Sequence, residues 1–118
     1  MGTIKTFREL DIWKRGIEPV KEIYSATKSF PSHEIYGLTS QMRRAAVSIP
    51  SNVAEGFRRR HPKEFKQFLS IALGSAAELE TQIVIAKELN YIGSDSEDRM
   101  LELIDHISRM IANLLTKL

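Results

Sequence analysis

Residues 94–118, SDSEDRMLELIDHISRMIANLLTKL, decide the fold class of this chain of 118 residues. Their apolar side chains recur at alternating steps of four and three residues, which places them on one face of an α-helix. Ser94 and Glu97 have the spacing of a capping box, the usual start of such a helix. The apolar repeat consists of Met100, Ile104, Ile107, Ile111, Leu114 and Leu118. The stretch therefore predicts an amphipathic helix of a helical bundle.

Three further stretches show the same periodicity. The first follows a second capping-box pair, Thr6 and Glu9, and the third begins at Pro62 and closes at Asn90, residues typical of helix starts and ends. The expected core positions are Leu10, Trp13, Ile17, Val20, Tyr24 and Thr27 in the first helix, Leu38, Met42, Ala45 or Ala46, Ile49 and Val53 in the second, and Phe65, Phe68, Ala72, Ala76, Leu79, Ile83 and Ala86 in the third. Four helices joined by short turns predict an all-α, antiparallel up-down four-helix bundle, with one domain over residues 1–118.

Several residues modify this pattern locally. Pro19 lacks a backbone N–H, so a kink is expected in the first helix. Ser32 is a candidate cap for the second helix, which Pro50 is expected to interrupt. Gly74 is expected to allow a neighbouring helix to approach closely.

The composition is that of a globular protein, with 42% hydrophobic and 27% charged residues. The absence of cysteine excludes disulfides and thiolate metal sites and fits a reducing cytoplasm. The N-terminal stretch has no apolar segment of a signal peptide, and no uninterrupted apolar run approaches the roughly 18 residues of a membrane span. We therefore expect a cytoplasmic protein that does not associate with a membrane.

The third and fourth helices carry more apolar residues than a single core stripe requires. The surplus consists of Leu69, Ile71, Leu73, Val84 and Ile85 in the third helix and Leu101, Leu103, Met110 and Leu115 in the fourth. A helix that is apolar around most of its circumference is buried on more than one side, so this surplus predicts self-association. The alternative interpretation is a wide core stripe within a monomer.

Positive charge is concentrated in one region of the chain. The net charge is only +2, but residues 41–66 contain seven bases and two acids, a local charge of +5 that leaves −3 for the other 92 residues. The bases are Arg43, Arg44, Arg58, Arg59, Arg60, Lys63 and Lys66. On a continuous helix Arg43 and Arg58 would lie within about 60° of each other and about 22 Å apart along the axis.

This basic stripe is long enough to follow several phosphates of a nucleic acid. The alternative is a solvated charged face with local ion pairs, since Glu55 precedes Arg58 by three residues and Arg59 by four.

Four polar residues lie in otherwise apolar or small-residue stretches: Asn52, Glu55, Ser75 and Glu78. They could form a ligand or catalytic site between helices. The simpler interpretation is a hydrogen-bonded structural network that fixes the register of the helices.

The sequence favours a protein that is not an enzyme and holds no metal or cofactor. It contains no Gly-rich phosphate loop, nucleophile elbow or zinc signature. Glu102 and His106 are four residues apart and could supply only two metal ligands, whereas di-iron bundles require Glu-x-x-His motifs on two helices. No catalytic residue is therefore predicted.

Residues 36–56, YGLTSQMRRAAVSIPSNVAEG, with Phe30, Pro31 and Glu34 before them, resemble the four-helix bundle proteins encoded in intervening sequences of bacterial 23S ribosomal RNA genes. Residues 7–13 and the stretch ALGSAAELE, residues 72–80, extend the resemblance over nearly the whole chain. It implies a ring-like homopentamer in the bacterial cytoplasm, in a family whose molecular function is not established.

A related type of protein, the accessory protein of diversity-generating retroelements, shares the pentameric bundle and binds nucleic acid through a basic surface. By this similarity, Arg43, Arg44 and the arginines at 58–60 are the positions expected to contact RNA or another nucleic acid. The alternatives are a protein-interaction scaffold that binds no nucleic acid, and a bundle that binds a metal or small ligand.

Overall fold

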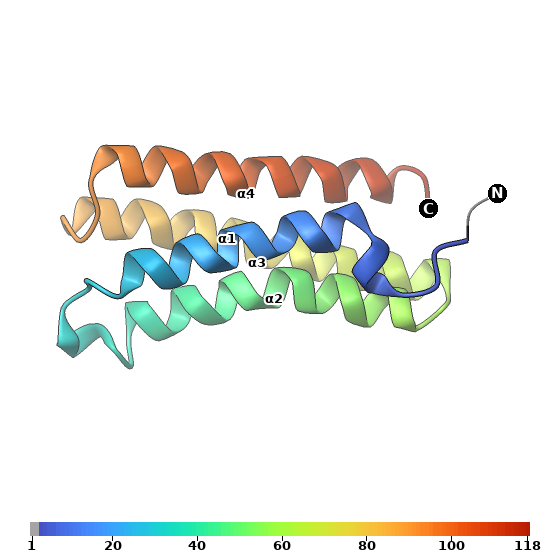
Figure 1. The fold of residues 1–118 in the computed structure, drawn as a ribbon, viewed down its shortest axis with the longest axis horizontal. Coiled ribbons are helices and arrows are strands. Elements are labelled where there is room, and N and C mark those ends of the chain that lie inside the picture. The colour runs from blue at the N-terminus through green and yellow to red at the C-terminus, as the bar shows by residue number, and fades with distance from the viewer. Residues whose placement is uncertain (1–2) are drawn as a thin grey trace.

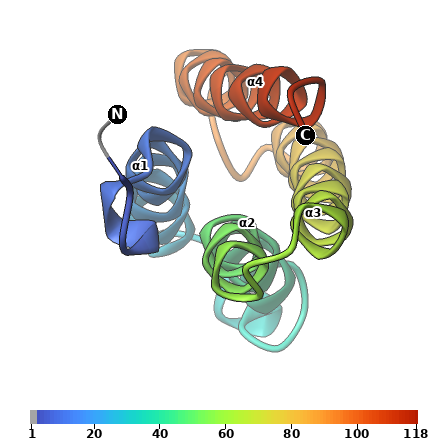
Figure 2. The same ribbon diagram turned by 90° about the vertical axis from the view of Figure 1, so that its right-hand side faces the viewer.

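Four helices account for most of the computed structural model, which describes residues 3–118. They are α1 (Asp11–Thr27), α2 (Leu38–Arg58), α3 (Pro62–Glu88) and α4 (Ser94–Leu115), and two 3-10 turns, η1 (Phe7–Glu9) and η2 (Ser32–Glu34), precede α1 and α2. Successive helices run in opposite directions (Figure 1), and the view along the bundle shows them in cyclic order around one interior (Figure 2). The predicted all-α four-helix fold is confirmed.

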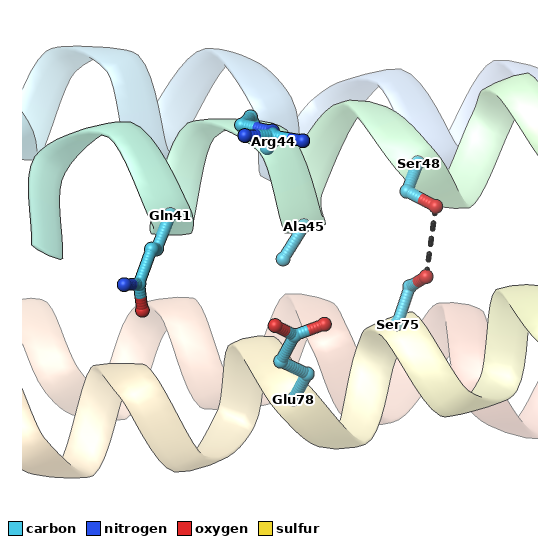
Figure 3. Close-up of a pocket in the computed structure, with 6 residues that line it drawn as sticks. All are labelled: Gln41, Arg44, Ala45, Ser48, Ser75 and Glu78. Atoms are coloured by element: carbon cyan, nitrogen blue, oxygen red, sulfur yellow. Dashed lines mark hydrogen bonds between the residues drawn. The ribbon is translucent and has the colours of Figure 1, made fainter. Parts of the chain in front are cut away.

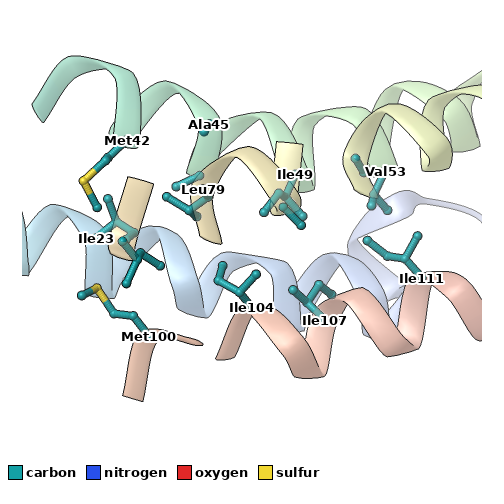
Figure 4. Close-up of a cluster of buried hydrophobic side chains, with 14 of the residues drawn as sticks. Ile23, Met42, Ala45, Ile49, Val53, Leu79, Met100, Ile104, Ile107 and Ile111 are labelled. Carbon is teal, nitrogen blue, oxygen red and sulfur yellow. The ribbon is translucent and has the colours of Figure 1, made fainter. Parts of the chain in front are cut away.

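Side chains from all four helices fill the interior. Ile23 of α1, Met42 of α2, Leu79 of α3 and Ile104 of α4 are each at most 1% exposed, and Figure 4 shows them within one cluster. The apolar repeats predicted in residues 42–53, 72–86 and 100–111 are buried. The outer positions of the same predicted repeats are half-buried: Leu38, Phe65, Phe68, Leu114 and Leu118. These three helices therefore pack with the faces that their sequences predict.

The predicted core face of α1 is right only at Thr27, which is buried as expected. The buried residues of this helix are Ile12, Gly16, Pro19, Ile23 and Thr27. The expected residues Leu10, Trp13, Ile17 and Val20 are only half-buried, and Tyr24 is 40% exposed.

The buried face of α1 is therefore rotated about the helix axis relative to the predicted face. The close packing of α1 on α2 accounts for this rotation. A Cβ atom on Gly16 would lie 3.5 Å from Cβ of Pro50, so the helix backbones approach where both side chains are small or compact. Pro19 and Pro50 are buried inside continuous helices, and Pro50 does not end α2. The side chains of Trp13 and Ile17 instead line a shallow apolar groove beside Val47 and Pro50.

Two of the predicted helix caps are also wrong, although α4 begins at Ser94 as expected. The capping box of Thr6 and Glu9 forms, with Glu9 Oε2 accepting the Thr6 N–H at 3.0 Å. It caps the start of η1, however, and not the start of α1. Ser94 is the first residue of α4, whose N-cap is Gly93, and no side chain caps that end. The expected end of α3 is confirmed, because Asn90 has a φ of 62° and reverses the chain there.

Glu34 takes the capping role that was expected of Ser32. One carboxylate oxygen of Glu34 accepts the Leu38 N–H at 3.0 Å at the start of α2, and the other accepts the hydroxyl of Tyr91 at 2.8 Å. Tyr91 follows α3, so this pair joins the two connections at one end of the bundle. The Leu38 N–H, the Tyr91 hydroxyl and nearby His33 hold the pKa of Glu34 below its ordinary value.

Glu34→Gln is expected to lower the melting temperature at neutral pH and to flatten its dependence on pH in acid. Because the pKa of Glu34 is lower in the folded than in the unfolded chain, its contribution is present above the unfolded pKa and is lost as pH falls through the folded one. The melting temperatures of variant and parent, measured from neutral pH down to pH 3, should converge as the pH falls. Glu80→Gln, a change at an exposed position on α3, is the control. An equal decrease in melting temperature in both variants would contradict the capping role of Glu34.

By length and composition, α3 could also cross a membrane, since an 18-residue window within it has a mean hydropathy of 1.3. Core helices of soluble proteins can have the same composition. The hydropathy of α3 therefore does not distinguish a membrane-spanning helix from a core helix. In this fold α3 packs against α2 and α4. The packing with α2 is the most extensive in the molecule, and that between α1 and α4 is the least extensive among the four pairs of neighbouring helices.

The apolar surplus predicted on α3 and α4 is divided by the fold. Leu69 is fully buried, and Leu73, Leu101, Met110 and Leu115 are half-buried against the core. Leu103 is half-buried and lines surface hollows beside α4. Three surplus residues are exposed, Ile71 at 51% and Val84 and Ile85 at 42% each, and all three lie on α3. The outer surface that remains for a second copy is therefore mainly on α3.

Candidate nucleic-acid interface

The arginines predicted to form one stripe along α2 face different neighbours. Arg43 turns toward α1, where its Nε donates to Thr27 Oγ1 at 2.8 Å and its guanidinium lies 4.6 Å from the centre of the Tyr24 ring. Arg44 lines a hollow on the α3 side of α2. Adjacent residues of a helix are about 100° apart, which separates the two guanidiniums.

The hollow on the α3 side has a volume of about 400 Å³ and contains two of the four residues of the predicted polar network, Ser75 and Glu78. Gln41, Ser48, Ser75 and Glu78 point into the gap between the two helices (Figure 3). Ser48 and Ser75 share a hydrogen bond of 2.8 Å between their Oγ atoms. Nδ2 of Asn52 donates to Oγ of Ser48 at 2.9 Å. The fold thus joins Asn52 to Ser75 through Ser48, a residue that sequence reasoning missed.

The other two residues of that predicted network have separate partners. Glu55 is outside the hollow and pairs with Arg59, with 3.3 Å between Oε2 and Nη2. Glu78 lines the hollow and accepts a long hydrogen bond of 3.5 Å from Nε2 of Gln82. Of the contacts made by this predicted network, only the Ser48–Ser75 hydrogen bond links α2 to α3, so the role of the network in fixing the helix register stays a prediction.

The turn between α2 and α3 carries a second, more basic site. Arg60 has a φ of 63°, which turns the chain sharply between the helices. Its Nη2 donates to the backbone oxygen of Lys5 at 3.2 Å, so the N-terminal segment lies against this turn. A hollow of about 310 Å³ separates the two segments and is lined by Lys5, Thr6, Phe7, Phe57, Arg58 and Arg60.

Aromatic rings support the arginines of this hollow. The guanidinium of Arg58 lies 5.6 Å from the centre of the Phe7 ring, and that of Arg60 lies 5.5 Å from the Phe57 ring. Arg8 contacts the Phe7 ring as well, at 6.0 Å. Such cation–π contacts hold a guanidinium in place without neutralising its charge.

The three consecutive arginines differ in their ion pairing. Arg59 faces Glu55 at 3.3 Å and Glu64 at 3.9 Å, as expected for a locally paired charged face. Within residues 3–118, no carboxylate lies within 4.0 Å of the guanidinium of Arg58 or Arg60. We call Lys5, Arg8, Arg58 and Arg60 the terminal basic cluster. Lys63 and Lys66 are exposed on the first turns of α3 at the same end.

Sequence reasoning missed the N-terminal half of this cluster. Lys5, Phe7 and Arg8 are about 50 residues away from the turn along the chain, and the sequence carries no pattern that places them beside it. Phe57 also went unnoticed because it precedes the arginine run as a single aromatic residue.

The remaining candidate cluster is on the outer face of α4. Glu102 and His106 line a hollow there with Asp105, and Asp105 pairs with Arg109 at 2.6 Å. In the part of the chain that the structure describes, no three His, Asp or Glu side chains are grouped as ligands of a metal ion.

Comparisons with known proteins agree with the fold. A family model described as 23S rRNA-intervening sequence protein matches residues 8–113. The chain is also similar to the crystal structure of a protein of unknown function from the S23 ribosomal protein family of Bacteroides thetaiotaomicron, with a TM-score of 0.81 and 19% identity over 88% of this chain and 97% of that one. At this identity the likeness shows the fold alone. No curated protein matches the sequence.

Proposed function

Because this chain belongs to the 23S rRNA-intervening sequence protein family, we propose that it is a non-enzymatic bacterial protein of the cytoplasm that binds RNA through the terminal basic cluster. The observation that carries the proposal is the pair of guanidiniums, on Arg58 and Arg60, that aromatic rings support and no described carboxylate neutralises. Guanidinium groups bind phosphate in a bidentate geometry, with two parallel N–H···O hydrogen bonds. We also propose a relation to the accessory proteins of diversity-generating retroelements, and this relation would imply the same assignment.

The charge distribution favours phosphate contacts at this end of the bundle. Lys63 and Lys66 extend the cluster along α3, whereas Arg43 is occupied by Thr27 and Tyr24 on α1. We therefore assign the main contacts to the α2–α3 turn and the N-terminal segment, and a lesser role to Arg43 and Arg44. Binding of this kind recognises the backbone of a structured RNA and carries little sequence information by itself.

We also propose that the protein acts as a homo-oligomer, a pentamer by family resemblance. The exposed apolar side chains of Ile71, Val84 and Ile85 on α3 support an interface between copies. Association would multiply the terminal basic cluster and raise affinity through several simultaneous contacts. Light scattering tests this part, because an oligomer has a mass several times the 13.5 kDa of the chain, and a mass of one chain at high concentration would contradict it.

A protein-interaction scaffold is the second candidate function. It is favoured by the connection between α1 and α2, where Tyr36 is 94% exposed and its neighbour Ile35 is 57% exposed. Exposed large apolar side chains at a loop tip are suitable anchors for a protein partner. A pull-down of the same partner after nuclease treatment, together with no RNA retention at low salt, would favour this function over RNA binding.

The double variant Arg58→Ala/Arg60→Gly is expected to weaken binding of a blunt RNA hairpin by about 100-fold, roughly tenfold for each of two lost hydrogen bonds to a charged group. Glycine is used at position 60 because the φ of 63° there is easier for glycine than for alanine. Fluorescence anisotropy titrations at several salt concentrations measure the effect. For the parent, about four phosphate contacts predict a loss of about 100-fold between 50 and 200 mM salt.

Arg59→Ala is the matched control, since this arginine is already paired with Glu55 and Glu64. It should change the affinity much less than the double variant. Unchanged binding by the double variant, or binding by the parent that does not depend on salt, would refute the proposed function.

A further inference from the structure

We infer that the hollow between the N-terminal segment and the α2–α3 turn binds one unpaired nucleotide of the RNA, with its base stacked among Phe7, Phe57 and the guanidiniums of Arg58 and Arg60. This inference rests on the proposed function and deepens it, because it names the form of RNA that the cluster selects. Salt-dependent phosphate binding alone does not require it.

The first support is the size and construction of the hollow. Its volume of about 310 Å³ is near the lower end of sites that hold small molecules, which are roughly 300–1,000 Å³. Its walls come from two segments that the hydrogen bond from Arg60 to the Lys5 oxygen holds together. Within the N-terminal segment, the carboxylate of Glu9 accepts the backbone N–H groups of Lys5 and Thr6 at 3.2 and 3.0 Å and fixes the shape of that wall. The hollow is therefore built before a ligand arrives.

The second support is the chemistry of its lining. Phe7 and Phe57 are half-buried, and each ring carries a guanidinium within 5.6 Å of its centre. A planar guanidinium that rests on a ring presents its outer face to a second planar group, and bases stack on both surfaces. The phosphate of the same nucleotide can meet the free N–H groups of the guanidiniums, since Arg60 uses only Nη2 within the described chain and Arg58 uses none.

The third support is the geometric difference between paired and unpaired bases. In an RNA duplex the faces of the bases are covered by their neighbours, so an aromatic lining gains nothing from duplex alone. A flat basic surface would suffice for a duplex backbone. Aromatic rings gathered with unpaired arginines at one end of the bundle instead match the combination found in sites for single strands.

The test compares three RNAs that share one hairpin: a blunt hairpin, the hairpin with a short single-stranded overhang, and the hairpin with the same overhang lacking its bases. The parent is expected to bind the overhang about tenfold more tightly than the blunt end, the effect of stacking roughly one base. Removing the bases while keeping the phosphates should abolish this preference.

Two variants should abolish the preference in the same titrations. Phe7→Leu keeps an apolar side chain without an aromatic face, and Arg58→Lys keeps the charge without the planar group. For both, the ratio of the Kd for the blunt hairpin to the Kd for the overhang should fall to about one. Tyr36→Leu removes an exposed aromatic ring at the opposite end of the bundle and should leave the ratio unchanged.

The outcomes separate this inference from the proposed function. Equal affinity for the three RNAs, with steep salt dependence, would refute the nucleotide site and retain phosphate binding. A preference that survives in the RNA without bases would also refute it, since phosphates alone would then explain the gain. Failure of all three RNAs to bind at low salt would refute both.

Discussion

Replacing Ile83 with alanine is expected to reduce the free energy of unfolding by about 2–5 kcal/mol. Ile83 lies on α3 and is fully buried, so the truncation leaves a cavity where side chains from the other helices meet. A domain of this size loses roughly 4 °C of melting temperature for each kcal/mol, which predicts a decrease of about 8–20 °C. Urea unfolding followed by circular dichroism measures the difference.

Ile85→Ala is the matched control for that experiment. It removes the same atoms two residues further along α3, where the side chain is 42% exposed. Its cost within one chain should be below that of Ile83→Ala by at least about 1 kcal/mol, since less apolar area is lost from the interior. A similar loss in both variants at low protein concentration, where copies are separate, would contradict the register of α3.

Gly56→Ala is expected to be the most damaging single-methyl addition, at a cost of about 1–3 kcal/mol. A Cβ at this position would lie 2.7 Å from Cβ of Phe68 and 3.0 Å from Cδ1 of Phe65. The Cβ of Phe68 is fixed to the backbone of α3 and cannot rotate away, so α2 and α3 must separate. The change should also shift the α2–α3 turn and weaken RNA binding with it.

Gly74→Ala supplies the control for Gly56→Ala. Apart from its chain neighbours and the local helix backbone, no atom lies within 4 Å of a Cβ built on Gly74, and Gly74 is exposed. Alanine should therefore stabilise the helix by roughly 0.5–1 kcal/mol, because it lowers the backbone entropy lost on folding. Thermal melting should move in opposite directions for the two variants; destabilisation by both would show that close contact is not the cause at Gly56.

These two glycines show where prediction from sequence reached its limit in the fold. Gly74 lies among small residues and was expected to permit close helix packing, whereas Gly56 does so in the structure. Composition near a glycine does not reveal which helix faces it. The core face of α1 was misplaced for a similar reason, because Gly16 and Pro19 add nothing to an apolar repeat although both are buried. Strong repeats such as the one ending at Ile111 needed no such information.

For the candidate interface, the sequence predicted which region supplies the basic residues better than it predicted how those residues are arranged in space. The excess of bases identified the region of Arg58–Arg60, and the Glu55–Arg59 pair follows helical spacing. Which arginines remain unpaired depended on Glu64 and on the return of the N-terminal segment, both consequences of tertiary structure. Arg43 was expected to join them, but its contact with Thr27 depends on the rotation of α1.

The uneven helix packing has a consequence for how the molecule forms. Most helix contacts join helices that follow each other in the chain, and only the seam between α1 and α4 brings the two ends of the sequence together. Contacts of short sequence separation close quickly, so we expect folding on a scale of roughly microseconds to milliseconds. The α1–α4 seam requires the longest loop closure, and the 2.6 Å contact between Arg99 and Glu22 spans it. The contacts of this seam should therefore form last during folding. The backbone amides of α1 and α4 should exchange their hydrogens before those of α2 and α3.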